Sequence, residues 1–175
     1  MSKKKKIIVL GLKGSGKTSI VLNFIGKFNL SDYSSNINVK SPNILKLKKR
    51  NIEFSIWDFN GEESHRKEFL TNFNNYIIDT EEIFFVIDIQ DLKSYESALN
   101  FLNDIIEKLH KLNIKVEFTF FLHKYDHDVF KRFPHINNEI IENLIGRINE
   151  LIPPESFHEI YKTTIYTIID KIHIY

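Results

Sequence analysis

The residues with the clearest chemical potential lie near the N-terminus, where positions 11–18 read GLKGSGKT. Their spacing satisfies the pattern G-x-x-x-x-G-K-[ST], and an apolar strand before it and a helical period after it supply the context that the pattern requires. The three glycines let backbone N–H groups face phosphate oxygens, and the helix that follows adds the positive end of its dipole. The motif therefore predicts a binding site for nucleotide phosphates.

Three side chains at the end of this loop are expected to contact the phosphates or a metal ion. Lys17 would bridge the β- and γ-phosphates, the Thr18 hydroxyl would coordinate Mg²⁺, and Ser19 could reach the α-phosphate. The predicted contact set is completed by the loop residues before them, Lys13, Gly14, Ser15 and Gly16. The loop alone does not identify the base or the reaction, because nucleotide kinases and ATPases use it as well.

A second acidic point ends the strand FSIWD, where Asp58 is followed by FNG and gives the pattern D-x-x-G at 58–61. Turns often satisfy this pattern by chance, so its position at the end of an apolar strand is what gives it weight. From there Asp58 can approach a metal ion near Thr18, and the Gly61 N–H can approach the γ-phosphate. We therefore predict Asp58 and Thr18 as metal ligands.

A third polar group follows the apolar strand VEFTFFL, where residues 123–126 read HKYD. A carboxylate at Asp126 can accept the N1–H and the N2 amino hydrogens of guanine, a pattern that adenine does not offer. Lys124 can lay its aliphatic stem over the base. These residues predict a preference for guanine.

The elements that must position these residues alternate along the chain. Strands are expected at 6–11, 44–49, 52–58, 83–88, 116–122 and 156–163, and helices at 17–28, 64–78, 94–112, 137–152 and from 167 onward. Apolar runs without alternation are typical of parallel strands covered on both faces, whereas 44–58 reads as an antiparallel hairpin at a sheet edge. We expect one domain over 1–175, a three-layer αβα fold of the P-loop NTPase class. It would have a six-stranded, mostly parallel sheet with one antiparallel edge strand, five helices, and a binding crevice at the carboxyl ends of the strands.

Composition excludes several other classes of protein. Lys and Arg number 24 against 23 Asp and Glu, so the formal charge of +1 gives no field that argues for nucleic acid. There is no cysteine, hence no disulfide, no thiolate zinc site and no palmitoyl or prenyl anchor. The apolar runs fall short of the roughly 20 residues of a spanning helix. We expect a cytoplasmic protein without a membrane anchor of its own, which a partner could recruit to a membrane.

Taken together, GLKGSGKT, D-x-x-G, HKYD and YKTTIY at 161–166 stand in the order found in small GTPases of the Ras superfamily, which the whole chain resembles. HKYD takes the place of the usual N-K-x-D, so the resemblance assigns His123, Lys124 and Asp126 to the base. It also assigns the backbone N–H near Thr164 and Ile165 to the guanine oxygen. GTP and GDP with Mg²⁺ are the ligands that it implies.

Within the superfamily the chain resembles the Rag/Gtr branch, through His123, IWDFNGEE, FFVIDIQD and TTIY. Members of that branch act as nucleotide-dependent switches in nutrient signalling and dimerise through a C-terminal roadblock domain. The sequence ends at Tyr175, so we expect a GTPase domain without a roadblock domain. Its partner would be another Rag-like GTPase or a separate roadblock- or longin-type protein.

Two departures from the family pattern bear on hydrolysis. Switch I normally carries a Thr that joins the Mg²⁺ shell, yet no Thr lies between Thr18 and Thr71; Ser35 is the best substitute, with Ser34 close behind. After Gly61, Glu62 stands where many GTPases carry a water-positioning Gln. We assign Gly61 and Glu62 to the catalytic step and expect slow hydrolysis, because a carboxylate near developing negative charge is repelled unless it is protonated or paired.

Three functions remain open from the sequence. The first is a GTP/GDP switch with slow catalysis, in which the γ-phosphate orders residues 29–42 and 59–75 for a partner to read. The second is a scaffold subunit that holds the nucleotide with negligible turnover, which Glu62 and the missing Thr favour. The third is an ATP-dependent kinase, against which HKYD argues.

Overall fold

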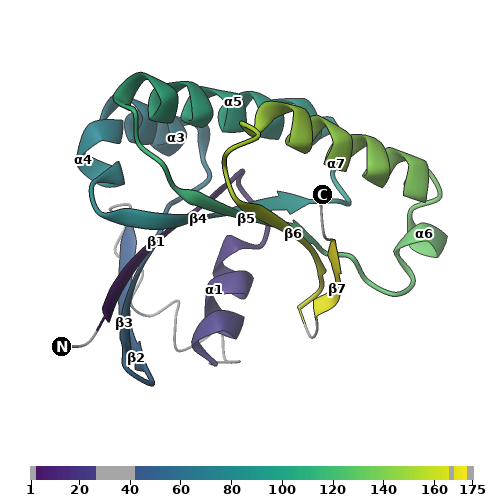
Figure 1. The fold of residues 1–175 in the computed structure, drawn as a ribbon. Coiled ribbons are helices and arrows are strands. Elements are labelled where there is room, and N and C mark those ends of the chain that lie inside the picture. The colour runs from purple at the N-terminus through teal and green to yellow at the C-terminus, as the bar shows by residue number, and fades with distance from the viewer. Residues whose placement is uncertain (1–2, 27–41, 166–167, 173–175) are drawn as a thin grey trace.

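The computed structural model of the protein describes residues 3–26, 42–165 and 168–172. Within these residues the strands form one seven-stranded sheet in the order β2-β3-β1-β4-β5-β6-β7 (Figure 1). The central strands are parallel, whereas β2 and β7 pair antiparallel with their neighbours at the two edges. The strands are β1 (Lys3–Gly11), β2 (Asn43–Lys49), β3 (Ile52–Asp58), β4 (Thr80–Asp88), β5 (Glu117–His123), β6 (His158–Thr163) and β7 (Ile168–Ile172).

The described helices are divided unequally between the two faces of the sheet. Figure 1 shows α3, α4, α5 and α7 on one face and α1 on the other, with the short α6 beyond the β6 end. Their bounds are α1 (Lys17–Ile25), α3 (Glu63–Thr71), α4 (Phe73–Ile77), α5 (Tyr95–Leu112), α6 (Val129–Arg132) and α7 (Asn138–Leu151), with a 3₁₀ turn η1 (Leu92–Ser94) before α5. Among the described residues, no helix combines the length and the apolar character needed to cross a membrane.

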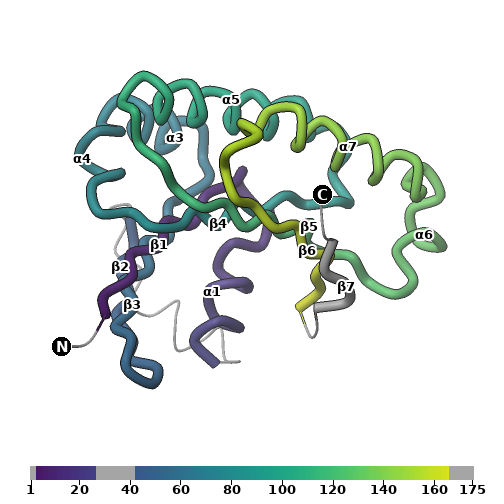
Figure 2. The backbone as a smooth tube through the Cα atoms, in the orientation of Figure 1, coloured from purple at the N-terminus to yellow at the C-terminus, as the bar shows by residue number. Residues whose placement is uncertain are grey.

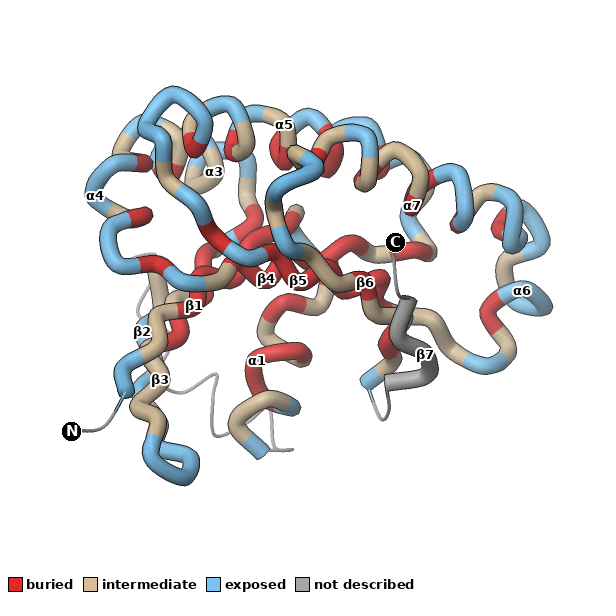
Figure 3. The backbone as a smooth tube through the Cα atoms, in the orientation of Figure 1, coloured by how far each residue is buried: buried red, intermediate tan, exposed pale blue. Residues whose placement is uncertain are grey.

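The core lies along the middle strands, which are buried on both faces. Ile8, Val9, Phe85 and Val86 are fully buried, and Figure 3 shows the buried tube concentrated in β1, β4 and β5. Helix α5 packs on this sheet with an apolar stripe at spacings of three and four, as an amphipathic helix must, and its outward residues are exposed. A rigid centre of this kind fixes the ends of its strands, from which the polar loops emerge.

The α/β fold class and its parallel sheet with an antiparallel edge hairpin are confirmed, and all six expected strands are present. The expected helix from 167 onward is wrong, because the chain forms β7 there and adds a second antiparallel edge to the sheet. Its Ile-rich sequence suits a strand, and pairing with β6 supplies the hydrogen bonds. The expected helix over 64–78 is divided at Asn72 into α3 and α4. With the unexpected α6, the described residues hold six α-helices rather than five.

Candidate functional site

The phosphate loop joins β1 to α1, and Figure 2 traces the chain through it as it turns under the sheet. Gly16 has φ 94°, in the left-handed region that favours glycine. A Cβ atom there would lie 2.2 Å from Cδ2 of His123, so the loop backbone rests directly on the His123 ring. The phosphate loop and the HKYD segment, more than 100 positions apart in the sequence, therefore meet in the fold.

His123 ends β5 and is 1% exposed. Its Nδ1 lies 3.0 Å from the Thr163 hydroxyl. Burial and, less strongly, the charge of Lys124 lower the pKa of the ring, Asp88 and Asp126 oppose this shift, and the resulting pKa is about 4. His123 is therefore neutral near pH 7, and its ring packs between the phosphate loop and the end of β6.

Lys17 is 7% exposed, and its ammonium donates a hydrogen bond of 2.8 Å to the Leu12 carbonyl. Burial lowers the pKa of Lys17 to about 8; the carboxylate of Asp58 raises it and the charge of Arg66 lowers it. Burial of this ammonium costs free energy, and a bound anion would offset that cost more fully than the present contacts do. The arrangement can bind a phosphate group.

The Thr18 hydroxyl donates to Oδ2 of Asp58 across 3.3 Å. Adjacent oxygen ligands of an octahedral Mg²⁺ ion lie about 3 Å apart, since each is about 2.1 Å from the metal. The spacing therefore fits a shared Mg²⁺ ion. The third predicted metal ligand, Ser35, lies outside the described residues.

Gly61 packs directly on the phosphate loop. A Cβ atom at this position would lie 2.3 Å from the Leu12 carbonyl carbon and 2.4 Å from the Lys13 nitrogen, so only glycine fits. Next to it, Glu62 accepts a hydrogen bond of 2.8 Å from the ammonium of Lys13. This ion pair lowers the pKa of Glu62 and raises that of Lys13. A carboxylate at this position is expected to be tolerated if it is protonated or paired, and in the structure Glu62 is paired with Lys13.

Ser15 supplies an independent sign of a ligand in the phosphate loop. The residue is 2% exposed, and its hydroxyl has no hydrogen-bond partner among the described residues. Buried hydroxyl groups are nearly always hydrogen-bonded, so such an exception needs an explanation. A phosphate oxygen held by this loop would provide the missing acceptor, and the loop therefore fits the ligand that its sequence predicts.

At the base end of the site, the backbone of Lys124 adopts φ 63°, which is uncommon for a residue with a side chain. Its carbonyl accepts a hydrogen bond of 2.8 Å from the Gln90 amide, and its ammonium lies 2.5 Å from Oδ2 of Asp88. Two contacts from the end of β4 thus hold the strained turn in place. They orient the residue that follows next but one, Asp126.

The carboxylate of Asp126 is held by three side chains. Oδ1 accepts a hydrogen bond of 2.7 Å from the Thr164 hydroxyl. Oδ2 accepts one of 2.5 Å from Arg132 and one of 3.3 Å from the Gln90 amide. Burial raises the pKa of Asp126, but the hydrogen bonds from Thr164 and Arg132 lower it, and the net shift is downward. The group is a fixed, ionised acceptor of the kind that guanine requires.

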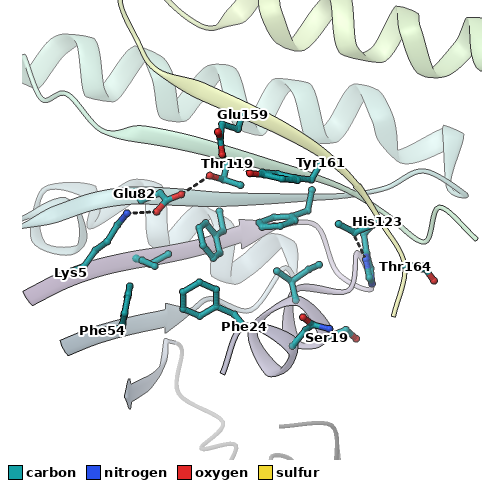
Figure 4. Close-up of a pocket in the computed structure, with 16 residues that line it drawn as sticks. Lys5, Ser19, Phe24, Phe54, Glu82, Thr119, His123, Glu159, Tyr161 and Thr164 are labelled. Carbon is teal, nitrogen blue, oxygen red and sulfur yellow. Dashed lines mark hydrogen bonds and ion pairs between the residues drawn. The ribbon is translucent and has the colours of Figure 1, made fainter. Parts of the chain in front are cut away.

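A hollow of about 360 Å³ lies on the α1 face of the sheet and adjoins the base end (Figure 4). Figure 4 shows the ion pair of Lys5 with Glu82 on one side of the hollow. On the other side lie His123 and Thr164, above Ser19 of α1. Aromatic side chains make up much of its lining. A mostly apolar lining does not suit phosphates, so the hollow is distinct from the phosphate site, and His123 and Thr164 connect it to the base end.

The structure brings most predicted site residues to one rim of the sheet. The phosphate loop contacts both the segment at 58–62 and the segment at 123–126. The Thr164 side chain reaches Asp126, a contact that the sequence did not indicate, whereas the side chain of Ile165 is 57% exposed.

Sequence reasoning missed three residues of the base end: Asp88, Gln90 and Arg132. Asp88 ends β4 beside His123 at the end of β5, and the carboxyl ends of adjacent parallel strands meet at one rim, so its place in the site could have been inferred. Gln90 follows from the same reasoning. Arg132 could not have been found in this way, because it reaches Asp126 from the short helix α6, which has no sequence signal of its own.

Comparisons with known proteins agree with this geometry. Human Ras-related GTP-binding protein C is 32% identical over 133 residues, which cover 71% of this chain and 31% of that protein. ADP-ribosylation factor-like protein 5 of Caenorhabditis elegans is 37% identical over 91 residues, 52% of this chain and 47% of that protein. The chain thus spans about half or less of the length of these curated relatives.

Solved structures share the fold. The Arl6 BBS3 small GTPase of Trypanosoma brucei, solved with the nucleotide analogue GppNp, superposes with a TM-score of 0.69 at 20% identity, covering 93% of this chain and 88% of that one. A bacterial selenocysteine-specific elongation factor matches over 93% of this chain and 26% of its own, with a TM-score of 0.60 and 15% identity. At such identities the likeness concerns the fold alone.

The sequence also matches the conserved region of Gtr1/RagA G proteins over residues 6–170, nearly its whole length. This match includes the phosphate loop, the D-x-x-G segment and HKYD, which the structure brings to one rim. The chain belongs to the Gtr1/RagA family of G proteins within the Ras superfamily.

Proposed function

We propose that this protein is a guanine-nucleotide switch that binds GTP and GDP with Mg²⁺, hydrolyses GTP slowly and presents its nucleotide state to a protein partner. The observation that carries the proposal is the contact of Gly16 with His123, which joins a phosphate-binding loop to a guanine-type acceptor in one site. Family membership supports the same activity, and the name of the human relative describes that protein as GTP-binding.

Each part of the site would perform one task. The phosphate loop and Lys17 would hold the β- and γ-phosphates, and Asp126 would accept the guanine N1–H and N2 hydrogens. Thr18 and Asp58 would hold Mg²⁺, which neutralises charge on the phosphates when it is bound. The N–H of Gly61 would approach the γ-phosphate from the opposite side of the loop, where its backbone already touches Lys13.

Slow turnover follows from the state of Glu62. Its pairing with Lys13 favours the ionised form, so it cannot donate a hydrogen bond to the phosphoryl group as an amide could. A fixed negative charge near a phosphoryl group that gains negative charge in the transition state is unfavourable. The ammonium of Lys13 offsets part of this repulsion, which is why we propose slow rather than absent hydrolysis.

The direct test is to measure binding of GTP, GDP and ATP with Mg²⁺ and then to follow phosphate release over hours. We expect GTP and GDP to bind in preference to ATP, and GTP to be hydrolysed no faster than about 10⁻⁴ s⁻¹, the order of unassisted Ras-type enzymes. A preference for ATP would reject the assignment. Tight GTP retention without any phosphate release would select the second candidate, a nucleotide-holding scaffold subunit.

The scaffold candidate rests on the Lys13–Glu62 ion pair, which joins the phosphate loop to the residue in the water-positioning place. A pair that stays closed over the γ-phosphate would exclude the attacking water. The sequence supports the same reading, because no Thr is available between 19 and 70 for the Mg²⁺ shell.

Replacing Glu62 with glutamine tests whether its carboxylate slows hydrolysis. The amide removes the negative charge and can orient a water molecule, so we expect single-turnover GTP hydrolysis to become about tenfold faster or more. Glu63→Gln is the matched control, because Glu63 is exposed and pairs with Lys67 on the same helix, and its rate should not change. A slower Glu62→Gln protein would mean that the carboxylate acts as a base.

The partner and location are part of the proposal. A switch needs a reader for residues 59–75, and the family suggests another Rag-like GTPase or a roadblock- or longin-type protein. The companion segment 29–42 lies almost entirely outside the described residues. We propose a cytoplasmic protein that reaches membranes through such a partner.

A further inference from the structure

The acceptor capacity of Asp126 is almost fully used within the protein. A carboxylate offers about four lone-pair sites, two on each oxygen. Thr164 takes one site on Oδ1, while Arg132 and Gln90 take both sites on Oδ2. Guanine needs two sites, one for its N1–H and one for its N2 amino group, and one site is left. A guanine base can make both bonds only if one of the three internal donors moves away.

Thr164 and Gln90 are poorly placed to leave. The Thr164 hydroxyl uses Oδ1, where a second site stays open, so it need not move. The Gln90 amide is also bound to the Lys124 carbonyl at 2.8 Å, a contact that holds the turn. The donor at Oδ2 that can withdraw without loss of such a second role is Arg132.

Arg132 also has a place to go. Its Nε already lies 3.1 Å from Oδ1 of Asp128, and its guanidinium carbon lies 5.5 Å from the centre of the Phe133 ring. The side chain is 47% exposed. A small rotation could transfer the guanidinium from Asp126 to Asp128 while its charge stays paired.

We propose that Arg132 is a positioning residue that competes with the guanine base for Oδ2 of Asp126, and so sets guanine affinity. Without a base, Arg132 holds the carboxylate in position. When guanine binds, the guanidinium moves onto Asp128. This inference rests on the proposed function, and it adds to it a residue that weakens nucleotide binding.

The test measures dissociation constants of GDP and inosine diphosphate by calorimetry for wild type, Arg132→Ala and Arg132→Lys. We expect Arg132→Ala to bind GDP about twofold to fivefold tighter, as loss of a competing exposed ion pair allows. Inosine diphosphate lacks the 2-amino group and can use the open site on Oδ1, so its affinity should stay the same. Arg132→Lys keeps a cation that can pair with Asp126 and should lie between wild type and Arg132→Ala.

Two further variants guard against a general charge effect. Lys131→Ala removes one positive charge from the neighbouring position and should bind GDP no tighter than wild type, because losing a cation by itself disfavours a polyphosphate. Asp128→Asn removes the second place for the guanidinium and should weaken GDP binding. Thermal unfolding of each variant, followed by circular dichroism, verifies that it is folded.

Several outcomes overturn the inference. Unchanged or weaker GDP binding by folded Arg132→Ala, equal tightening for inosine diphosphate, or tightening by Lys131→Ala would each show that Arg132 does not compete with the base. Failure of wild type and Lys131→Ala alike to bind GDP would instead reject the proposed function, and this inference with it. The two failures are therefore distinguishable in one set of measurements.

Discussion

Replacing Lys17 with alanine is expected to weaken GDP binding about 100-fold, a loss of roughly 3 kcal/mol. The lysine begins α1 and is almost fully buried, with its ammonium against the Leu12 carbonyl. A buried charge of this kind is unfavourable for the empty protein and favourable only when an anion is present. The dissociation constant for GDP with Mg²⁺, measured by calorimetry, gives the result directly.

The phosphate loop contains its own control for this substitution. Lys13 is four positions earlier, but its side chain is 75% exposed and points to Glu62. Lys13→Ala should therefore change GDP affinity by no more than a few-fold. If the two alanine variants lose the same affinity, Lys17 has no special role and the loop attracts phosphates only by its overall charge.

GDP affinity should also depend on pH differently in wild type and in Lys17→Ala. The pKa of Lys17 is about 8 in the free protein, and bound phosphates favour its charged form and so raise this pKa. Below pH 8 the ammonium is already present. Above pH 8 the free protein must take up a proton to bind, so GDP affinity should fall, by up to about tenfold per pH unit. Lys17→Ala should lack this part of the dependence, whereas ionisation of guanine itself affects both proteins.

The fold and the site differ in how much of each the sequence could predict. GLKGSGKT, Asp58 and HKYD were recognisable because each follows an apolar strand, and parallel strands bring their carboxyl ends to one rim. Local chemistry and the sheet geometry pointed to the same place. The failure at 168–172 has the opposite cause, because a short Ile-rich segment can form a strand or a helix and the decision belongs to its partner β6.

The contacts that tune the site were hidden for a further reason. The pair Lys13–Glu62 joins two loops, and the pair Arg132–Asp126 joins α6 to the segment that follows β5, so both depend on how the backbone folds between the two residues. No spacing rule relates residues 49 positions apart. Sequence motifs thus identified the groups expected to touch a nucleotide, whereas the charges that oppose or support those groups required the three-dimensional arrangement.

Replacing Asp126 with asparagine is expected to exchange guanine for xanthine as the preferred base. The Thr164 hydroxyl donates to the Oδ1 position, so the amide carbonyl oxygen should take that place and accept the N1–H of the base as well. The amide nitrogen would take the place of Oδ2, from which Arg132 can move to Asp128. Gln90 keeps its bond to the Lys124 carbonyl. The amide would then meet the 2-amino group of guanine donor to donor. In xanthine a carbonyl oxygen stands at that position and accepts.

We expect GDP affinity to fall about 100-fold or more, because a buried donor is left without an acceptor, while xanthosine diphosphate should bind better than it does to wild type. The two affinities are measured by displacing a ribose-labelled nucleotide, GDP or xanthosine diphosphate, with each unlabelled nucleotide in turn. Asp91→Asn, the same change at an exposed carboxylate after β4, should leave the selectivity of wild type intact. Unchanged selectivity in Asp126→Asn would mean that the base is recognised elsewhere, and the contact between HKYD and the phosphate loop would then serve packing alone.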